Sequence, residues 1–150
     1  MHLIIPMAGK GKRMRPHTLT TPKPLIPIAG KPIVARLVEE VCGACPIPIR
    51  TIGFVVNELG EDTQAQLSQL AQSMGAQAEF YRQHEAQGTA HAVLCAAVLL
   101  QGPVMVAFAD TLFKCSFTLD INQESVIWVK KVQDPSAFGV VKLDAQSMVT

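Results

Sequence analysis

The chain opens with the run HLIIPMAGKGKRMRP, which occupies residues 2–16. Its apolar part predicts a buried strand over residues 2–7, because a short apolar run bounded by turn residues is typical of such a strand. The loop predicted to follow, residues 8–31, contains Gly9 and Gly11. Glycine lets backbone N–H groups come close to an anion, because no Cβ stands in the way. The opening run therefore predicts a strand that ends in an anion-binding loop.

Charge and proline are distributed unevenly, and both concentrate in this first segment. Seven of the 13 basic residues lie within the first 36 positions, whereas the first acidic residue is Glu39. Six of the ten prolines lie there as well, and proline disfavours both a helix interior and a central strand. A basic disordered arm is the alternative, but the glycines and the apolar residues between the prolines oppose it. We expect an ordered, basic and extended loop.

Strands and helices are predicted to alternate along the rest of the chain. Apolar spacing and end signals predict helices at residues 32–44, 61–75 and 88–100. Apolar runs predict further strands at residues 51–56, 76–81, 104–109, 125–131 and 138–143. Such an alternation predicts the α/β class, with a parallel or mixed sheet covered on both faces. It also places Asp110 directly after a strand.

The overall composition excludes several classes of protein. The 150 residues are 49% hydrophobic and 17% charged, with a net charge of +1. This balance argues against a disordered chain and against nucleic-acid binding by the chain as a whole. No apolar run reaches the ~20 residues of a membrane span, and the apolar start precedes its charges, the reverse of a secretory signal. We expect a cytoplasmic protein without a membrane or nucleic-acid partner.

The cysteines and histidines do not form a metal site in the sequence. Cys42 and Cys45 have C-x-x-C spacing, but Cys95 and Cys115 do not supply the second pair that structural zinc needs. The pair is predicted to end a helix, whereas reactive thiolates are favoured at helix starts. We therefore expect inert thiols. The four histidines also lack metal-ligand spacing and are expected to be non-catalytic: His2, His17, His84 and His91.

The glycine loop departs from two common nucleotide-binding patterns. A Walker A loop needs G-x-x-x-x-G-K-[ST], which is absent. A dinucleotide fingerprint needs G-x-G-x-x-G leading into a helix, whereas here Met14 takes the last position and the chain continues through Pro16. Taken alone, the loop is therefore weak support for nucleotide binding.

Five pieces of the sequence together resemble the sugar-1-phosphate nucleotidyltransferases, also called nucleotide-sugar pyrophosphorylases. The pieces are GKGKRMRP at 9–16, TPKPLIPIAGKP at 21–32, Gln83 with GTA at 88–90, AFAD at 107–110 and DPSAFGVV at 134–141. The resemblance covers essentially the whole chain, and it departs from the usual family pattern at Lys12, Ala109 and Phe138. It implies a Rossmann-like three-layer α/β/α fold with a mostly parallel, mixed sheet.

The resemblance also implies roles for individual residues. Arg13 and Lys23 would be catalytic, with Arg13 near the departing phosphates and Lys23 near the α-phosphate. Asp110 would bind Mg²⁺, an ion that prefers few carboxylates together with substrate phosphates. The nucleotide would contact Met7, Ala8, Gly9, Lys10, Gly11, Lys12, Gln83, Gly88 and Thr89. The sugar would contact Phe138 and Gly139.

The implied reaction joins a nucleoside triphosphate to a sugar 1-phosphate. The sugar phosphate would attack the α-phosphorus of dTTP or UTP, with glucose 1-phosphate as the expected sugar and pyrophosphate as the leaving group. The Gln83 amide suits the imide edge of uracil or thymine. A mannose-1-phosphate guanylyltransferase and a non-catalytic nucleotide-binding module are the alternatives. A nucleic-acid binder is disfavoured, because the chain has one Trp, one Tyr and no basic–aromatic interleaving.

The length of 150 residues is shorter than the resemblance implies for a whole enzyme. Further contacts to the sugar phosphate and a second metal-binding aspartate would follow in the family pattern after residue 150. We therefore expect residues 1–150 to be the nucleotide-binding part of a truncated nucleotidyltransferase domain, with poor turnover by itself. The sequence leaves the oligomeric state open, a homo-oligomer included.

Overall fold

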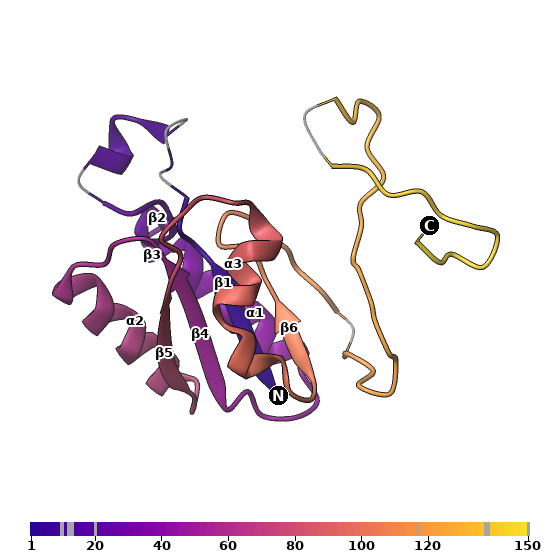
Figure 1. Ribbon diagram of the computed structural model, residues 1–150, viewed down its shortest axis with the longest axis horizontal. Coiled ribbons are helices and arrows are strands. Elements are labelled where there is room, and N and C mark those ends of the chain that lie inside the picture. The colour runs from indigo at the N-terminus through magenta and orange to yellow at the C-terminus, as the bar shows by residue number, and fades with distance from the viewer. Residues whose placement is uncertain (10, 12–13, 20, 117, 137–138, 150) are drawn as a thin grey trace.

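The computed structural model describes residues 1–9, 11, 14–19, 21–116, 118–136 and 139–149. Four of the predicted site residues lie outside this set: Lys10, Lys12, Arg13 and Phe138. Figure 1 shows a central sheet flanked by helices, with the segment after β6 running beside it.

The sheet has four parallel strands in the order β5-β4-β1-β6. The strands are β1 (His2–Pro6), β4 (Thr51–Val56), β5 (Gln77–Arg82) and β6 (Val104–Val106). The first three confirm the predicted strands to within one residue. All carboxyl ends therefore meet at one edge of the sheet. The chain adds β4 and β5 on one side of β1 and then crosses to add β6 on the other side.

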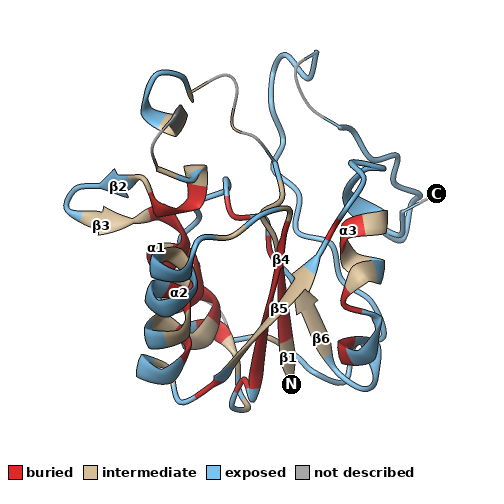
Figure 2. Cartoon of the chain, turned by 60° about the vertical axis from the view of Figure 1, so that its left-hand side comes forward, coloured by how far each residue is buried: buried red, intermediate tan, exposed pale blue. Residues whose placement is uncertain are grey.

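Alternating side chains of the central strands bury the two faces of the sheet. Leu3 and Phe54 pack on one face, against α1 (Ile33–Ala44) and α2 (Glu61–Ser73). Ile4 and Val55 pack on the other, against α3 (Thr89–Cys95) and the 3₁₀ helix η4 (Ala97–Leu100). Figure 2 shows the buried strands between these two helical layers. The predicted three-layer α/β/α fold is confirmed. Among the described residues its central sheet has four strands, all of them parallel, where a mixed sheet was expected.

Helix boundaries follow the sequence signals closely. α1 begins after Pro32, and its apolar stripe of Val34, Leu37, Val38 and Val41 is fully buried or nearly so. α2 begins at Glu61 and Asp62, whose carboxylates favour the positive end of a helix. The helix predicted at residues 88–100 is divided at Ala96 into α3 and η4.

The predicted extended loop contains short regular elements instead. It holds the 3₁₀ turns η2 (His17–Leu19) and η3 (Lys23–Leu25), and the antiparallel pair β2 (Pro27–Ile28) and β3 (Lys31–Pro32). Leu25 is buried in the same core cluster as α1, so it ties η3 to the body of the protein. Lys23 therefore lies in a tight turn and not in the extended backbone that its neighbouring prolines predicted.

Two predicted strands are wrong, and a third is shorter than predicted. β6 ends at Val106, three residues early. Described residues of 125–131 and 138–143 form no strand, and only an isolated bridge joins Leu143 to Val149. Apolar residues there are exposed, such as Ile127 at 62%. An apolar run becomes a strand only where a neighbour accepts its backbone hydrogen bonds. No described helix is long and apolar enough to cross a membrane.

Gly53, in the middle of β4, permits the close approach of the α3–η4 layer. A Cβ at this position would lie 2.6 Å from Leu99 Cδ1 and 3.1 Å from Tyr81 Cε2. We expect Gly53→Ala to lower the free energy of unfolding by about 2 kcal/mol through overpacking. Urea unfolding measures this, with Gly43→Ala as the control, because a Cβ at Gly43 meets no atom within 4 Å. An unchanged midpoint for Gly53→Ala would contradict the packing described.

Candidate functional site

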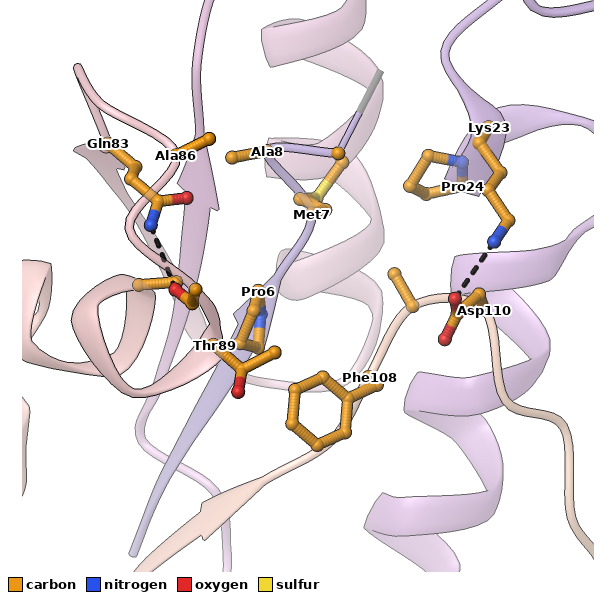
Figure 3. Close-up of a pocket in the computed structure, with 14 residues that line it drawn as sticks. Pro6, Met7, Ala8, Lys23, Pro24, Gln83, Ala86, Thr89, Phe108 and Asp110 are labelled. Atoms are coloured by element: carbon orange, nitrogen blue, oxygen red, sulfur yellow. Dashed lines mark hydrogen bonds and ion pairs between the residues drawn. The ribbon is translucent and has the colours of Figure 1, made fainter. Parts of the chain in front are cut away.

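A pocket of about 330 Å³ opens at the carboxyl edge of the sheet, beside β1 and β6 (Figure 3). It lies where the strand order reverses, the position at which open α/β sheets bind ligands. The loop after β1, η3, the start of α3 and the turn after β6 all contribute. Its lining residues are Pro6, Met7, Ala8, Gly9, Lys23, Pro24, Gln83, Ala86, Gly88, Thr89, Ala92, Phe108, Ala109 and Asp110.

Lys23 and Asp110 form an ion pair at one end of this pocket. Lys23 Nζ donates a hydrogen bond to Asp110 Oδ2 at 2.9 Å, although the two residues are 87 positions apart. Asp110 lies in a turn closed by the Thr111 N–H, which donates to Phe108 O at 3.0 Å. The aspartate thus lies within a turn, four residues after the end of β6, and not directly at the end of the strand. The side chains are 28% and 53% exposed, so both remain within reach of a ligand.

The Lys23 ammonium keeps Asp110 in its charged form. Its hydrogen bond is the main cause that holds the pKa of the Asp110 carboxyl below the usual 3.8. No group of three His, Cys, Asp or Glu side chains in the described part of the chain could hold a metal by itself. A single ionised carboxylate at the rim of a pocket nevertheless suits Mg²⁺, which takes few protein carboxylates and completes its shell with phosphates and water.

The depressed pKa of Asp110 predicts how pH affects this ion pair. Because the folded pKa lies below the unfolded value, the pair stabilises the fold above pH 3.8 and loses this contribution as pH falls through the folded pKa. A pair this exposed contributes at most about 1 kcal/mol. Urea unfolding of the wild type and Asp110→Asn should therefore differ at neutral pH and converge in acid. A difference that does not change with pH would contradict the pairing.

The loop after β1 lines the same pocket as this ion pair, through Met7, Ala8 and Gly9. Met7 N–H donates to Val55 O at 2.8 Å, which holds the loop against the sheet as it leaves β1. Gly11 has φ +56°, and a Cβ there would lie 2.8 Å from Thr18 Cγ2 and 3.2 Å from Lys23 Cβ. Thr18 Oγ1 also donates to Gly11 O at 2.9 Å. Gly11 therefore lets the loop pack against the backbone position of Lys23.

Gln83 lies at the other end of the pocket, just after β5. Gln83 is 7% exposed, and its backbone N–H donates a hydrogen bond to Val56 O at 2.8 Å. Its side-chain Nε2 donates to Gly88 O at 3.1 Å and lies 3.1 Å from His91 Nδ1. Gly88 precedes α3 with φ +94°, a conformation that favours glycine. In Figure 3, Gln83 and the Lys23–Asp110 pair lie on opposite sides of the pocket.

The structure brings most of the described site residues into this one pocket. Met7, Ala8, Gly9, Lys23, Gln83, Gly88, Thr89 and Asp110 line it, and Gly11 packs behind Lys23. Gly139 is exposed and does not line it, so its role toward the sugar stays a prediction. Six lining residues were not predicted: Pro6, Pro24, Ala86, Ala92, Phe108 and Ala109. Each of the six lies within three residues of a predicted site residue, and this proximity in sequence is the one signal that could have indicated them.

Cys42 and Cys45, the C-x-x-C pair, have the character of inert thiols, because burial raises the pKa of both. Burial, with a smaller contribution from Cys45, raises the pKa of Cys42 to about 11. All four cysteines are free, and the C-x-x-C pair lies at the end of α1, as the sequence predicted. A thiol that stays protonated at neutral pH is a poor nucleophile and a poor metal ligand.

Comparison with known proteins agrees with this geometry. "Bifunctional protein GlmU" of Methanococcus maripaludis is 32% identical over 143 residues, covering 95% of this chain and 33% of the relative. "Mannose-1-phosphate guanylyltransferase catalytic subunit beta" of Danio rerio is 32% identical over 158 residues, covering 98% of this chain and 42% of the relative. The chain thus spans a third to two fifths of these curated relatives.

A solved structure and a family profile give the same assignment. The structure of UDP-glucose pyrophosphorylase complexed with UDP-glucose superposes with a TM-score of 0.55 at 25% identity, over 73% of this chain and 45% of that one. Residues 3–150 match the family described as "Nucleotidyl transferase". Strand order, pocket position, sequence identity and profile agree, and the chain belongs to the nucleotidyl transferase family.

Proposed function

We propose that residues 1–150 form the nucleotide-binding part of a sugar-1-phosphate nucleotidyltransferase. The whole enzyme would join dTTP or UTP to glucose 1-phosphate and release pyrophosphate. One observation carries the proposal: a single pocket has a buried amide at one end, on Gln83, and an exposed Lys23–Asp110 ion pair at the other. A nucleoside triphosphate has the matching arrangement, with a hydrogen-bonding base at one end and charged phosphates at the other.

At the phosphate end, Lys23 would stabilise negative charge on the α-phosphate as the sugar phosphate attacks. The expected reaction asks for little covalent chemistry from the protein, so positioning and electrostatic stabilisation account for most of the catalysis. Lys23 is held for this purpose by η3, whose Leu25 is anchored in the core. Arg13, proposed to neutralise the departing phosphates, belongs in sequence to the same segment between β1 and α1 as Lys23.

Asp110 is proposed as the Mg²⁺ ligand of this part of the site. A bound Mg²⁺ would supply positive charge that offsets the charge developing on the phosphate oxygens. Asp110 is suited to this role because its carboxylate is ionised and about half exposed beside Lys23. Nucleotide binding would exchange the partners of the ion pair, so that Lys23 meets phosphate and Asp110 is freed for the cation.

At the base end, Gln83 and Gly88 are proposed to contact the base, with Met7, Ala8 and Thr89 beside them. The apolar side chains of Met7 and Phe108, on neighbouring segments of the pocket, would accommodate the nucleoside between the two polar ends. A mannose-1-phosphate guanylyltransferase remains the second candidate. The 32% identity to relatives of that name favours it.

The release of pyrophosphate distinguishes these candidates. The chain is incubated with Mg²⁺ and either dTTP or UTP with glucose 1-phosphate, or GTP with mannose 1-phosphate. Pyrophosphate from the first combination supports the proposed reaction, and pyrophosphate from the second supports the guanylyltransferase. Nucleotide that raises the melting temperature without any pyrophosphate release would indicate a non-catalytic binding module. We expect slow turnover, because the chain spans only a third to two fifths of the length of its curated relatives.

A further inference from the structure

Both N–H groups of the Gln83 side-chain amide are used inside the protein. Its Nε2 lies 3.1 Å from Gly88 O and 3.1 Å from His91 Nδ1. An amide nitrogen has two hydrogens, so these two contacts use both of them. Gln83 is 7% exposed, which leaves little room for water to replace either partner. The nitrogen of this amide is therefore not available to a ligand.

The partners of Gln83 also fix which way its amide points. Gly88 O can only accept a hydrogen bond, so the amide atom that faces it is nitrogen and not oxygen. The same carbonyl accepts the Ala92 N–H at 3.2 Å, as the first hydrogen bond of α3. His91 Nδ1 accepts the second amide hydrogen, and the ring proton then resides on Nε2. His91 is thus a second anchor, in the first turn of α3.

This anchoring leaves the carbonyl oxygen of Gln83 for the pocket. Oε1 accepts no hydrogen bond from any described residue. It is also not fully buried, because among the described residues the one side-chain nitrogen or oxygen that is buried without a partner is His2 Nδ1. Figure 3 shows the oxygen directed toward the side of the pocket where Met7 lies. At its base end the pocket therefore presents a hydrogen-bond acceptor.

We propose that His91 is a specificity-determining positioning residue, which holds the Gln83 amide so that a base meets only its acceptor oxygen. This inference rests on the proposed nucleotide pocket. Uracil, thymine and guanine carry a ring N–H on the edge that such an acceptor reads. Cytosine and adenine carry a ring acceptor at the corresponding position, which the oxygen repels. His91 thereby favours keto bases over amino bases without touching the nucleotide.

Gly88 alone cannot enforce this preference. The Gly88 carbonyl fixes which amide atom faces α3, but it holds only one of the two N–H groups. Without His91, the whole amide can pivot about the Nε2–Gly88 O contact and bring its second N–H into the pocket, where it can donate to the ring nitrogen of cytosine. His91 prevents this by taking that hydrogen. Loss of His91 should therefore relax the choice of base more than it weakens nucleotide binding. If His91 had only a structural role, its replacement would instead lower the affinity for all nucleotides alike.

The test compares UTP with CTP, which share ring size and phosphates but differ at the base edge. Titration calorimetry on the full chain with Mg²⁺ gives the affinity ratio for wild type, His91→Phe and His91→Asn. We expect His91→Phe to reduce the UTP preference about tenfold, the factor that one hydrogen bond commonly contributes. His91→Asn should restore it, because Asn Oδ1 can accept in place of Nδ1. His84→Phe, an exposed neighbour of Gln83, is the control.

A double-mutant cycle separates the positioning role from a packing role. In a Gln83→Leu background, His91→Phe should leave the UTP:CTP ratio unchanged, because there is no amide left to orient. A wild-type ratio in His91→Phe alone, or an equal loss in the Gln83→Leu background, would overturn the inference. If the wild-type chain binds no nucleoside triphosphate at all, the proposed function fails and the role of His91 falls with it.

Discussion

Replacing Lys23 with alanine is expected to slow pyrophosphate release by about 100-fold, the usual loss when one electrostatic donor to a transition state is removed. Lys23 Nζ is the cation that the structure places next to Asp110, at the phosphate end of the pocket. Its removal takes charge stabilisation from the α-phosphate, where negative charge accumulates. Single-turnover measurements with dTTP and glucose 1-phosphate would record the loss even where turnover is slow.

Lys31 offers a matched control for this substitution. It also lies in the segment between β1 and α1, and it is also ion-paired, with Nζ 2.5 Å from Glu39 Oε1. It does not line the pocket. Lys31→Ala should therefore leave the rate near that of the wild type. A rate for Lys23→Ala within about threefold of the wild type would contradict the electrostatic role.

Replacing Asp110 with alanine is expected to lower the magnesium-linked part of nucleotide affinity by about 10- to 100-fold. The carboxylate is the pocket's one acidic side chain among the lining residues that the structure describes. Without Mg²⁺ the effect should reverse or vanish, because the substitution also releases Lys23 from its ion pair. Titrations of dTTP with and without Mg²⁺ separate these two contributions.

The control for Asp110 is Asp62, an exposed carboxylate in the first turn of α2. Asp62→Ala should retain the magnesium dependence of the wild type, because the residue lies away from the pocket lining. If Asp110→Ala kept the same dependence as the wild type, Asp110 would not be the metal ligand. A loss of affinity that is equal with and without Mg²⁺ would instead indicate a structural role.

Local signals were sufficient to predict the core of the fold. The apolar run at residues 51–56 is β4 to the residue, since a strand buried on both faces needs an uninterrupted apolar sequence. The acidic pair at Glu61 and Asp62 correctly predicted the start of α2. The apolar residues at 125–131 and 138–143 also predicted strands, but the described residues of these two segments form none. Apolar character alone does not provide a neighbouring strand, which depends on the tertiary structure.

The site was predictable in part for a similar reason. Parallel strands bring their carboxyl ends to one edge, so the residues after β1, β5 and β6 could be expected to meet there. The 2.9 Å contact of Lys23 with Asp110 depends on how η3 and the turn after β6 fold over that edge. His91 gave no signal in the sequence beyond the absence of metal spacing. Its contact with Gln83 arises because the chain returns after β5, so that Gly88 and the first turn of α3 lie against the Gln83 side chain.

The central claim is that one pocket binds a nucleoside triphosphate with its base at Gln83 and its phosphates at Lys23. Titration of dTTP into the wild-type chain, Gln83→Leu and Lys23→Ala in the presence of Mg²⁺ tests this claim most directly. The account predicts saturable binding at one site, weakened by each substitution, with the preference for dTTP over CTP lost only in Gln83→Leu. Saturable binding with the same affinity in all three proteins, or no saturable binding to the wild type, would contradict it.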